Sequence, residues 1–418
     1  MYVENDREAT GGNLLLRLVG CFFVLCCLNP WTSFSLNSMD SQPWALIFGV
    51  VFIFCARRVR VPPYFTVMFF AVLFGSIVSF ALSSSPELDD IARFVASYAS
   101  LLVVYLGFYN FLALYGFPRK IFLIAGWSWI AFAVIEAFYP AITSALSSQR
   151  TSEGRGLTSL APEPTFFAIF LIFYSWILLK ARSKELNFTD KVTLVVAISS
   201  VLLLARSAMG MLYIMVGVSV FLSFAFADNL LKGLIKKSHI VALIFSAIST
   251  VVVIFYINSV MPDSRIGKII STFSELSADD IATIVRLDKS IFIRVAHATI
   301  SLHAAIINAG LPGGIDTFVS QGREVAELWG KVFWDFTPGN KIQSWNGALF
   351  YELGVFGIIY YMAIILSSRK NNGALLAEIA TVILFLTGAI PIAFPLVPML
   401  FALWTYNSKN NAKMNQIV

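Results

Sequence analysis

Long apolar segments alternate with short polar loops along almost the whole chain. A window of about 20 residues, the length that crosses a bilayer as a helix, predicts about twelve helices. They are expected at 14–36, 43–56, 62–82, 91–115, 121–140, 165–180, 192–206, 208–227, 238–258, 346–366, 374–390 and 391–406. A bilayer offers no water to unpaired backbone groups, so the predicted fold class is an all-α polytopic membrane protein.

Two of these apolar blocks are too long for one crossing. The stretch 192–227 carries Arg206 near its middle, and because a buried guanidinium is costly, we predict two helices joined there by a tight turn. The block 374–406 contains Pro391 and Pro395, which interrupt a helix, so it is divided at that point.

Composition and loop charge agree with a membrane protein. Apolar residues make up 58% of the chain and charged residues only 13%, which is typical of a membrane protein. With the N-terminus inside, seventeen basic residues fall in cytoplasmic segments, whereas the short outer loops hold only Arg150, Arg155 and Arg206. The positive-inside rule therefore predicts that both termini are cytoplasmic. The net charge of +6 reflects this topology, and no nucleic-acid binding is expected.

One long segment interrupts the pattern, because from Asn258 to Trp345 the chain mixes acidic, basic and apolar residues. We predict three parts: helices and short loops at 1–257, a large outer-face loop domain at 258–345, and the last helices with a cytoplasmic tail at 346–418. Residues 277–307 are expected to form an amphipathic helix that ends at the turn 311–314. A loop of this length in a compact protein is usually functional.

The cysteines predict no cofactor or cross-link. All four, Cys21, Cys26, Cys27 and Cys55, fall in the first two predicted spans. They offer neither a disulfide framework nor zinc-ligand spacing. We expect helix one to be uncleaved, although the residues before Cys21 superficially resemble a lipoprotein processing site.

The first candidate site is the segment RTSEGRGLTSLAPEPTFFA, residues 150–168. Pro162 and Pro164 hold Glu163 in an extended conformation at the start of a helix, whose dipole favours negative charge. We expect Arg155 to bind a phosphate, Arg150 to assist in substrate binding, and Glu163 to orient a sugar hydroxyl or accept its proton. The alternative is that Glu163 only caps the helix and pairs with Arg155.

Two further arginines lie on the same predicted face. Arg206, in the turn ARSAMG, is expected to face the outer water layer or a cavity, although it can also be an arginine that reaches lipid headgroups. Arg294 shares a helix face with His297, and His303 lies farther along the same helix. Either histidine can move protons near neutrality, but a packed, hydrogen-bonded histidine is the commoner case. The three histidines of the chain do not have metal-ligand spacing.

The fourth candidate is SWNGALFYELGVFGIIYYM, residues 344–362, where the chain re-enters the membrane. Asn346 is expected at the mouth of a cavity, and Trp345 can stack on a sugar face. Glu352 lies deeper, so it is either paired with a basic group or neutral. The alternative is an aromatic belt with one buried polar pair.

Two acidic features remain open. The loop 87–90 has three carboxylates that can bind a metal or simply be solvated. Glu136 either joins the outer-face site or pairs with Arg93.

Taken together, these residues resemble a known family. The pattern R-x-L-x-x-L-x-P-E-P-x-F-F-A at a helix start, A-R-S-A-M-G between two later helices, one large late outer loop, and Y-E-L-G-V-F-G on re-entry are similar to the Wzy-type O-antigen polymerases. Those belong to the O-antigen polymerase and ligase superfamily, bacterial inner-membrane glycosyltransferases of the GT-C kind. The resemblance covers about 150–359 in motif.

The resemblance implies a metal-independent transfer of a glycan from undecaprenyl pyrophosphate to a second lipid-linked repeat unit at the periplasmic face, with inversion. It implies that Arg206 and Arg294 bind the pyrophosphate and that Arg155 and Glu163 belong to the site. The implied partners are the lipid-linked donor and acceptor, the bilayer, a chain-length regulator and a flippase. The ligase branch usually has a His-Asn pair before re-entry, where this chain has Ser344, Trp345 and Asn346.

The chemistry favours the same reaction independently. A tethered pyrophosphate leaves without acid catalysis when arginines stabilise its charge, and one base then suffices for the acceptor hydroxyl. Glu163 is the first candidate base, with His303 and His297 behind it. An O-antigen ligase and a non-enzymatic transporter of lipid-linked sugars are the alternatives. An enzyme needs Arg155, Arg206 and Arg294 around one outer cavity, whereas a transporter needs a midplane site.

Overall fold

The computed structural model describes residues 14–32, 42–146, 156–182, 186–231, 289–333, 335–339, 341–368 and 373–415. Every regular element within these ranges is a helix, so the predicted all-α class is confirmed for them. Four segments are long and apolar enough to cross a bilayer, namely Leu88–Tyr115, Arg119–Phe138, Pro164–Ala181 and Phe188–Ala205, and several other helices are apolar but shorter. Of the twelve predicted spans, 238–258 lies outside the described residues.

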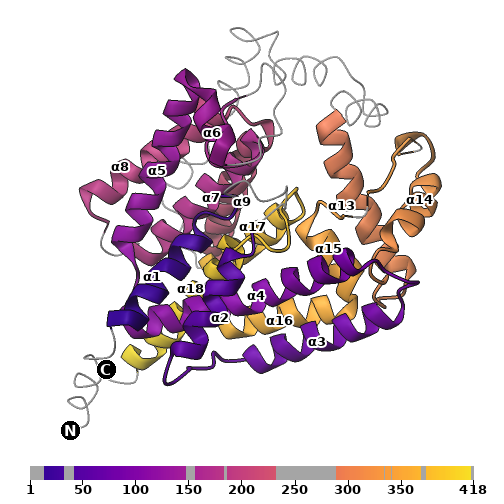
Figure 1. Ribbon diagram of the computed structural model, residues 1–418, viewed down its shortest axis with the longest axis horizontal. Helices are drawn as coiled ribbons and strands as arrows, with labels where there is room; N and C mark the ends of the chain where they lie inside the picture. The colour runs from indigo at the N-terminus through magenta and orange to yellow at the C-terminus, as the bar shows by residue number, and fades with distance from the viewer. Residues whose placement is uncertain are drawn as a thin grey trace.

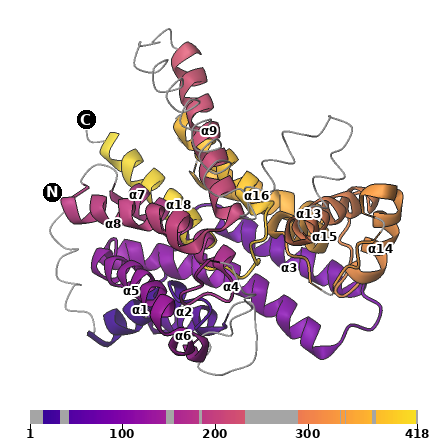
Figure 2. The same cartoon turned by 90° about the horizontal axis from the view of Figure 1, so that it is seen from above.

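The first half of the chain forms the larger group of helices. In order these are α1 (Leu14–Cys27), α2 (Trp44–Cys55), α3 (Phe65–Ala81), α4 (Leu88–Tyr115), α5 (Arg119–Phe138), α6 (Pro140–Leu146), α7 (Pro164–Arg182), α8 (Phe188–Ser200), the π-helical turn η2 (Val201–Ala205) and α9 (Ala208–Leu231). Figure 1 shows α1, α5, α7 and α8 gathered on one side, and Figure 2 shows α9 projecting from them.

The second half of the chain supplies the remaining helices. They are α13 (Lys289–Ile307), α14 (Phe318–Leu328), the short 3₁₀ turn η4 (Gly330–Val332), α15 (Trp345–Leu353), α16 (Val355–Ser368), α17 (Gly373–Leu386) and α18 (Leu396–Asn415). Helices α13, α14 and α15 pack together on the side opposite α5 and α8, as Figure 1 shows. Helix α18 returns to the first group and packs against α4 and α7.

Several predicted boundaries are explained by single residues. Pro164 begins α7, as expected for a residue that lacks an amide hydrogen and has a fixed φ. Arg206 adopts a left-handed conformation with φ 45°, so the split predicted between two helices at Arg206 is confirmed. Pro391 and Pro395 lie between α17 and α18, which confirms the second predicted division.

The predicted span 346–366 is wrong as one helix, because the chain breaks at Gly354 into α15 and α16. Gly354 has φ +56°, and a Cβ there would lie 2.2 Å from the carbonyl oxygen of Gly310. The next amide, Val355 N, donates to that oxygen at 2.7 Å. With 9 residues, α15 is too short to cross a bilayer, which needs about 20, so we place it outside the spanning segments.

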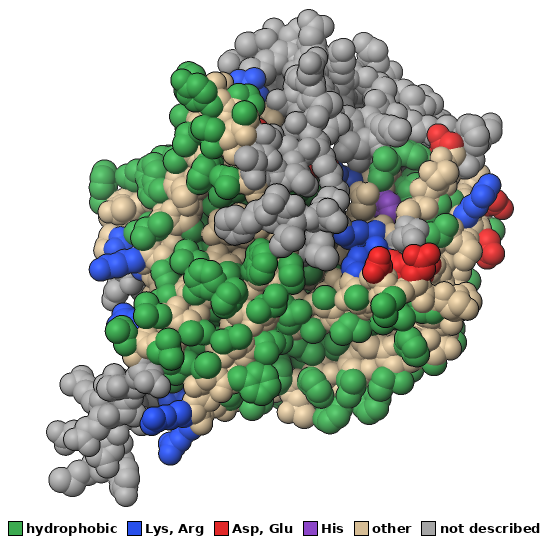
Figure 3. All heavy atoms as spheres, in the orientation of Figure 1, with side chains coloured by type: hydrophobic (Ala, Val, Ile, Leu, Met, Phe, Trp, Pro, Cys, Tyr) green, Lys and Arg blue, Asp and Glu red, His purple; other side chains and the backbone are tan. Residues whose placement is uncertain are grey.

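Helix α7 is the centre of the main core. Trp129 of α5 stacks on both Phe167 and Phe170 of α7, and Phe170 stacks on Tyr174. A second apolar cluster joins α13, α14 and α15 through Phe292, Phe318, Phe333 and Phe336. Large apolar side chains also cover much of the surface, as Figure 3 shows, which is the distribution expected where lipid is the solvent.

Candidate functional site

Three segments that are far apart in the sequence meet at one polar junction. Arg294, in the second turn of α13, donates through Nη2 to Oε2 of Glu163 at 3.2 Å and to Oγ1 of Thr165 at 3.3 Å. The hydroxyl of Ser207, before α9, donates to the same Thr165 oxygen at 3.3 Å. The side chains of Glu163 and Arg294 are 22% and 11% exposed. We call Glu163, Thr165, Ser207 and Arg294 the polar junction.

Glu136 of α5 holds the loop that leads to Glu163. Its carboxylate accepts hydrogen bonds from the amide and hydroxyl of Thr158 and from the amide of Ser159, at 2.5–3.1 Å. Glu136, Thr158 and Ser159 are all buried. The prediction that Glu136 pairs with Arg93 is therefore wrong, because its acceptors are used by the loop, and Arg93 instead forms an ion pair with Asp90.

Gly156 fixes the same loop against the π-helical turn η2. The amide of Leu157 donates to the carbonyl of Leu204 at 2.9 Å. A Cβ at Gly156 would lie 1.9 Å from the Ala205 carbonyl oxygen, so only glycine permits this approach. A π-turn is unusual and is often found at functional sites. Here it brings the Arg206 turn beside the start of the described loop.

Arg206 lies next to the junction, but its side chain points differently from Arg294. It is exposed, and its Nε donates to the carbonyl of Leu203 at 3.1 Å. Its neighbour Ser207 accepts a hydrogen bond from the amide of Gly210 at 3.3 Å, which caps α9. Arg206 is thus linked to Arg294 through its neighbour Ser207 and through Thr165. Among the described residues, no direct contact joins the two guanidinium groups.

The junction is electrostatically suited to an anion. Glu163 precedes the first residue of α7, and Ser207 precedes the first residue of α9, so two helix N-termini meet there. Each helix N-terminus carries a partial positive charge and unpaired amide hydrogens. Arg294 adds a full positive charge. Glu163, for which pairing with Arg155 was considered, forms an ion pair with Arg294 and offsets this charge.

Two of the predicted arginines cannot be placed, and both histidines have partners outside the polar junction. Arg150 and Arg155 are outside the described residues. His297 is buried between Phe318 and Phe336, and burial lowers its pKa to about 4. The Nδ1 of His303 accepts a hydrogen bond from Nε1 of Trp329 at 2.9 Å. Neither histidine has a described contact with Glu163 or Arg294, so the geometry favours neither as the base.

The residues at the start of α15 are part of the core. Trp345 is fully buried among Tyr360, Tyr361 and Phe401, so the expected stacking on a sugar would require this packing to open. Asn346 is 3% exposed. Its amide donates to the Ile383 carbonyl and to Thr387, and its oxygen accepts from Tyr361. The expected position at a cavity mouth is therefore wrong for Asn346.

Glu352 belongs to a separate polar group near the start of α4. Its Oε2 accepts a hydrogen bond from the Tyr98 hydroxyl at 2.8 Å. Burial raises the pKa of Glu352 to about 7, although Tyr98, Arg93 and Lys341 lower it. Burial also lowers the pKa of Lys341 to about 8. The prediction that Glu352 is either paired with a basic group or neutral stays a prediction.

No metal site appears where acidic residues were considered. Among the described residues, no three His, Cys, Asp or Glu side chains lie close enough together to hold a metal ion. Glu87 and Asp90 of the acidic loop lie at the start of α4, and Asp90 is the partner of Arg93. Asp90 is buried, so it is not simply solvated, and the choice between a metal-binding and a solvated loop stays open.

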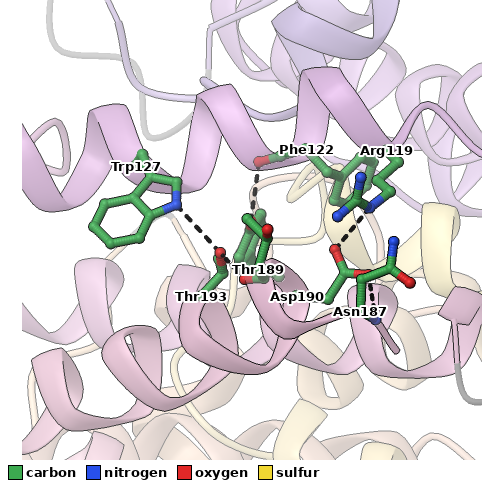
Figure 4. A network of polar contacts seen from close by, with 8 residues as sticks. Arg119, Phe122, Trp127, Asn187, Thr189, Asp190 and Thr193 are labelled. Atoms are coloured by element: carbon green, nitrogen blue, oxygen red, sulfur yellow. Dashed lines mark hydrogen bonds and ion pairs between the residues drawn. The ribbon is translucent and has the colours of Figure 1, made fainter. Parts of the chain in front are cut away.

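Another ion pair joins α5 and α8. Arg119 begins α5, and its Nε donates to Oδ1 of Asp190 at 2.8 Å, with no exposure of the Asp190 side chain. Asp190 also takes part in a capping box with Asn187, and Thr193 accepts a hydrogen bond from Trp127. Figure 4 shows these contacts bridging α5 and α8. This pair has the geometry of a structural clamp.

Two members of the junction were missed in the sequence. Thr165 and Ser207 were inside the quoted motifs, but no role was given to their hydroxyls. The available signal was that each hydroxyl stands one or two positions from a charged residue at a helix start.

Comparisons with protein-family models, with curated protein sequences and with solved structures found no match. The site must therefore be interpreted from its own chemistry.

Proposed function

We propose that this protein is a membrane-embedded glycosyltransferase that polymerises oligosaccharide repeat units carried on a polyprenyl pyrophosphate. The observation that supports this most is the polar junction, where Arg294, Glu163 and the N-termini of α7 and α9 come together. A pyrophosphate is the leaving group that such a positively charged, partly buried position would stabilise.

In the proposed reaction the acceptor hydroxyl oxygen attacks the anomeric carbon of the donor glycan. The bond between that carbon and the pyrophosphate oxygen breaks, and the electron pair leaves with the pyrophosphate. Arg294, Arg206 and Arg155 stabilise the developing negative charge. The acceptor proton passes to a base, and a single displacement inverts the anomeric carbon.

Glu163 is our proposed base, and its ion pair suggests how it is controlled. In the unloaded protein its Oε2 accepts a hydrogen bond from Arg294. An arriving pyrophosphate competes for Arg294, which releases the carboxylate for the acceptor hydroxyl. Binding of the donor thus prepares the base for the second substrate.

The proposal includes a membrane arrangement. We place the polar junction and a loop domain at 258–345 on the periplasmic side of a bacterial inner membrane, and both termini in the cytoplasm. The helix α7 separates Glu163 from Lys180, which pairs with Glu378 at 2.8 Å. Seventeen residues of helix correspond to about 26 Å, comparable with the hydrocarbon thickness of about 30 Å.

Deletion and reconstitution test the proposed function. Cells lacking a polymerase should retain single repeat units on the lipid core but lose long chains, whereas cells lacking a ligase should lose all glycan from that core. Purified protein in liposomes should convert a lipid-linked repeat unit into a ladder of longer lipid-linked products. Transport of the lipid-linked unit without any elongation would overturn the proposal in favour of a transporter.

A further inference from the structure

A half-open pocket between α13 and α14 shares no lining residue with the polar junction. Its volume is about 370 Å³, and its apolar walls include Ile307, Val325 and Leu328. Its polar lining consists of Asn308, Gln321 and Glu324. A few polar groups in a mainly apolar pocket of this size are typical of a small-ligand site.

A chain of hydrogen bonds fixes the orientation of Gln321 in this pocket. The hydroxyl of Tyr351 donates to Oε1 of Gln321 at 2.9 Å, and Nδ2 of Asn308 donates to the same oxygen at 3.2 Å. Tyr351 is buried, and its hydroxyl is also joined to Thr317 at 2.8 Å. Because both donors reach one oxygen, the other end of the Gln321 amide is the nitrogen, which can only donate.

The remaining polar atoms offer both donors and acceptors. Among the described residues, neither Nε2 of Gln321 nor Oδ1 of Asn308 makes a hydrogen bond, and Glu324 is exposed. Burial is the main reason that the pKa of Tyr351 is raised, so Tyr351 keeps its proton and its donor role. A ligand with adjacent hydroxyl groups satisfies such a set, because each hydroxyl both donates and accepts.

An aromatic residue, Trp329, directly follows Leu328 of the pocket lining in the chain. Trp329 follows α14 directly, is 40% exposed, and contacts His303 of α13. An exposed indole with an apolar face and a polar edge suits the apolar face of a sugar ring. His303, which was considered as a base, is thus better placed to hold Trp329 in position.

We propose that the pocket between α13 and α14 binds a saccharide unit of the acceptor glycan. The identity of this ligand as an acceptor rests on the proposed function. Arg294 and Asn308 lie fourteen residues apart on or just after one helix, which corresponds to about 20 Å. An extended oligosaccharide, rather than one sugar, would therefore bridge the pocket and the polar junction.

Cysteine protection tests the pocket without any need for catalysis. Leu328 is 69% exposed at the pocket, so maleimide labelling of a Leu328→Cys variant reports on access. The native Cys55 on α2 is also exposed and serves as the internal reference in the same molecule. The probe is the repeat-unit oligosaccharide released by mild acid from the host's own lipid-linked intermediates, free of lipid and pyrophosphate.

The proposal predicts that this oligosaccharide slows labelling at position 328 and leaves labelling of Cys55 unchanged. Adding Gln321→Met keeps the side-chain length but removes both hydrogen-bonding atoms. It should raise the oligosaccharide concentration needed for half-maximal protection about tenfold. Arg323→Gln, an exposed position on the same helix, is the matched control and should not raise it. If Gln321→Met misfolds, Asn308→Ala tests the same contacts.

The possible failures are distinguishable. Protection that persists in Arg294→Ala without any polymerisation by the wild-type protein would retain the saccharide pocket and overturn the proposed function. Polymerisation without protection of position 328 would overturn the pocket alone. Protection by a sugar-free polyprenyl phosphate but not by the oligosaccharide would also overturn it, and would identify the pocket as a lipid-chain site.

Discussion

The pairs Arg294–Glu163 and Arg119–Asp190 each join an arginine to a carboxylate. They differ in how exposed the carboxylate is and in how many hydrogen bonds it accepts. The Asp190 side chain has no exposed surface, and it bonds both Arg119, at 2.8 Å, and the amide of Asn187, at 3.3 Å. The Glu163 side chain is 22% exposed, and among the described residues only its Oε2 is bonded, to Arg294 at 3.2 Å.

The difference separates a pair that holds helices together from one that can exchange partners. Breaking a buried, fully bonded pair leaves a charge without compensation. A longer, partly exposed ion pair loses less free energy when a ligand replaces one of its partners. We therefore expect substitutions at the Arg119 pair to act on stability and those at the Arg294 pair to act on activity.

The largest expected effect is the loss of activity in Arg294→Ala. Removing one preorganised donor to a developing anion typically costs about 100- to 1,000-fold in rate, and we expect a loss in that range. The measurement is the initial rate of chain elongation in liposomes containing equal amounts of folded protein. A rate within a few-fold of wild type would remove Arg294 from the site and with it the contrast between the two pairs.

Glu163→Gln should lower the rate of elongation by about 100-fold, the usual contribution of a general base. The substitution keeps the side-chain shape and a hydrogen-bond acceptor for Arg294, so folding and donor binding should persist. The same elongation assay, with donor concentration varied, separates the turnover rate from donor affinity. If turnover is unchanged and only donor affinity falls, Glu163 positions Arg294 and is not the base.

Arg119→Ala tests the other side of the comparison through stability. It removes the Arg119 cation from the buried Asp190 carboxylate, which should destabilise the fold by about 3 kcal/mol. Thermal unfolding in detergent should show a clearly lower midpoint, while the rate per folded molecule stays near that of wild type. An unchanged midpoint combined with lost elongation would reverse the assignment of the two pairs.

The smallest expected effect concerns the Glu352 carboxylate. Its pKa in the folded protein is about 7, raised by burial from 4.5, so the folded state holds this proton more tightly than the unfolded chain. The resulting stability is fully present below about pH 4.5 and is lost as the pH rises through 7. Glu352→Gln should flatten that decline, measured as the unfolding midpoint at several pH values, whereas the exposed Glu327→Gln should not. An equal slope in Glu352→Gln would contradict the assignment.

The sequence predicted the all-α class and several chain breaks because their signals are local. Pro164 and the left-handed Arg206 mark chain breaks that apolar length and helix-breaking residues already indicated. The break at Gly354 was missed because it depends on the approach of Gly310, a contact that lies 44 positions away in the chain and has no local signal. Glycine within Y-E-L-G-V-F-G was compatible with either a continuous or a broken helix.

The candidate site was predicted only in part for a similar reason. Glu163, Arg206 and Arg294 were selected because charges in an apolar chain need a purpose, and that argument requires no knowledge of neighbours. The pairing of Glu163 with Arg294, the bridging hydroxyls of Thr165 and Ser207, and the burial of Trp345 all depend on how distant segments pack. The role of Glu136 was missed because a carboxylate that accepts backbone amides cannot be distinguished in sequence from one that pairs with an arginine.

The most direct test of the polar junction is equilibrium binding of a polyprenyl pyrophosphate to the purified protein in lipid nanodiscs. Our account predicts that Arg294→Ala weakens binding at least about tenfold, since a charged hydrogen bond is worth about 1.5–3 kcal/mol. It also predicts that Glu163→Gln binds as tightly as wild type or more tightly, because Arg294 then faces a neutral amide in place of a competing carboxylate. Equal affinity of wild type and Arg294→Ala, or a loss of binding in Glu163→Gln as large as that in Arg294→Ala, would contradict the account.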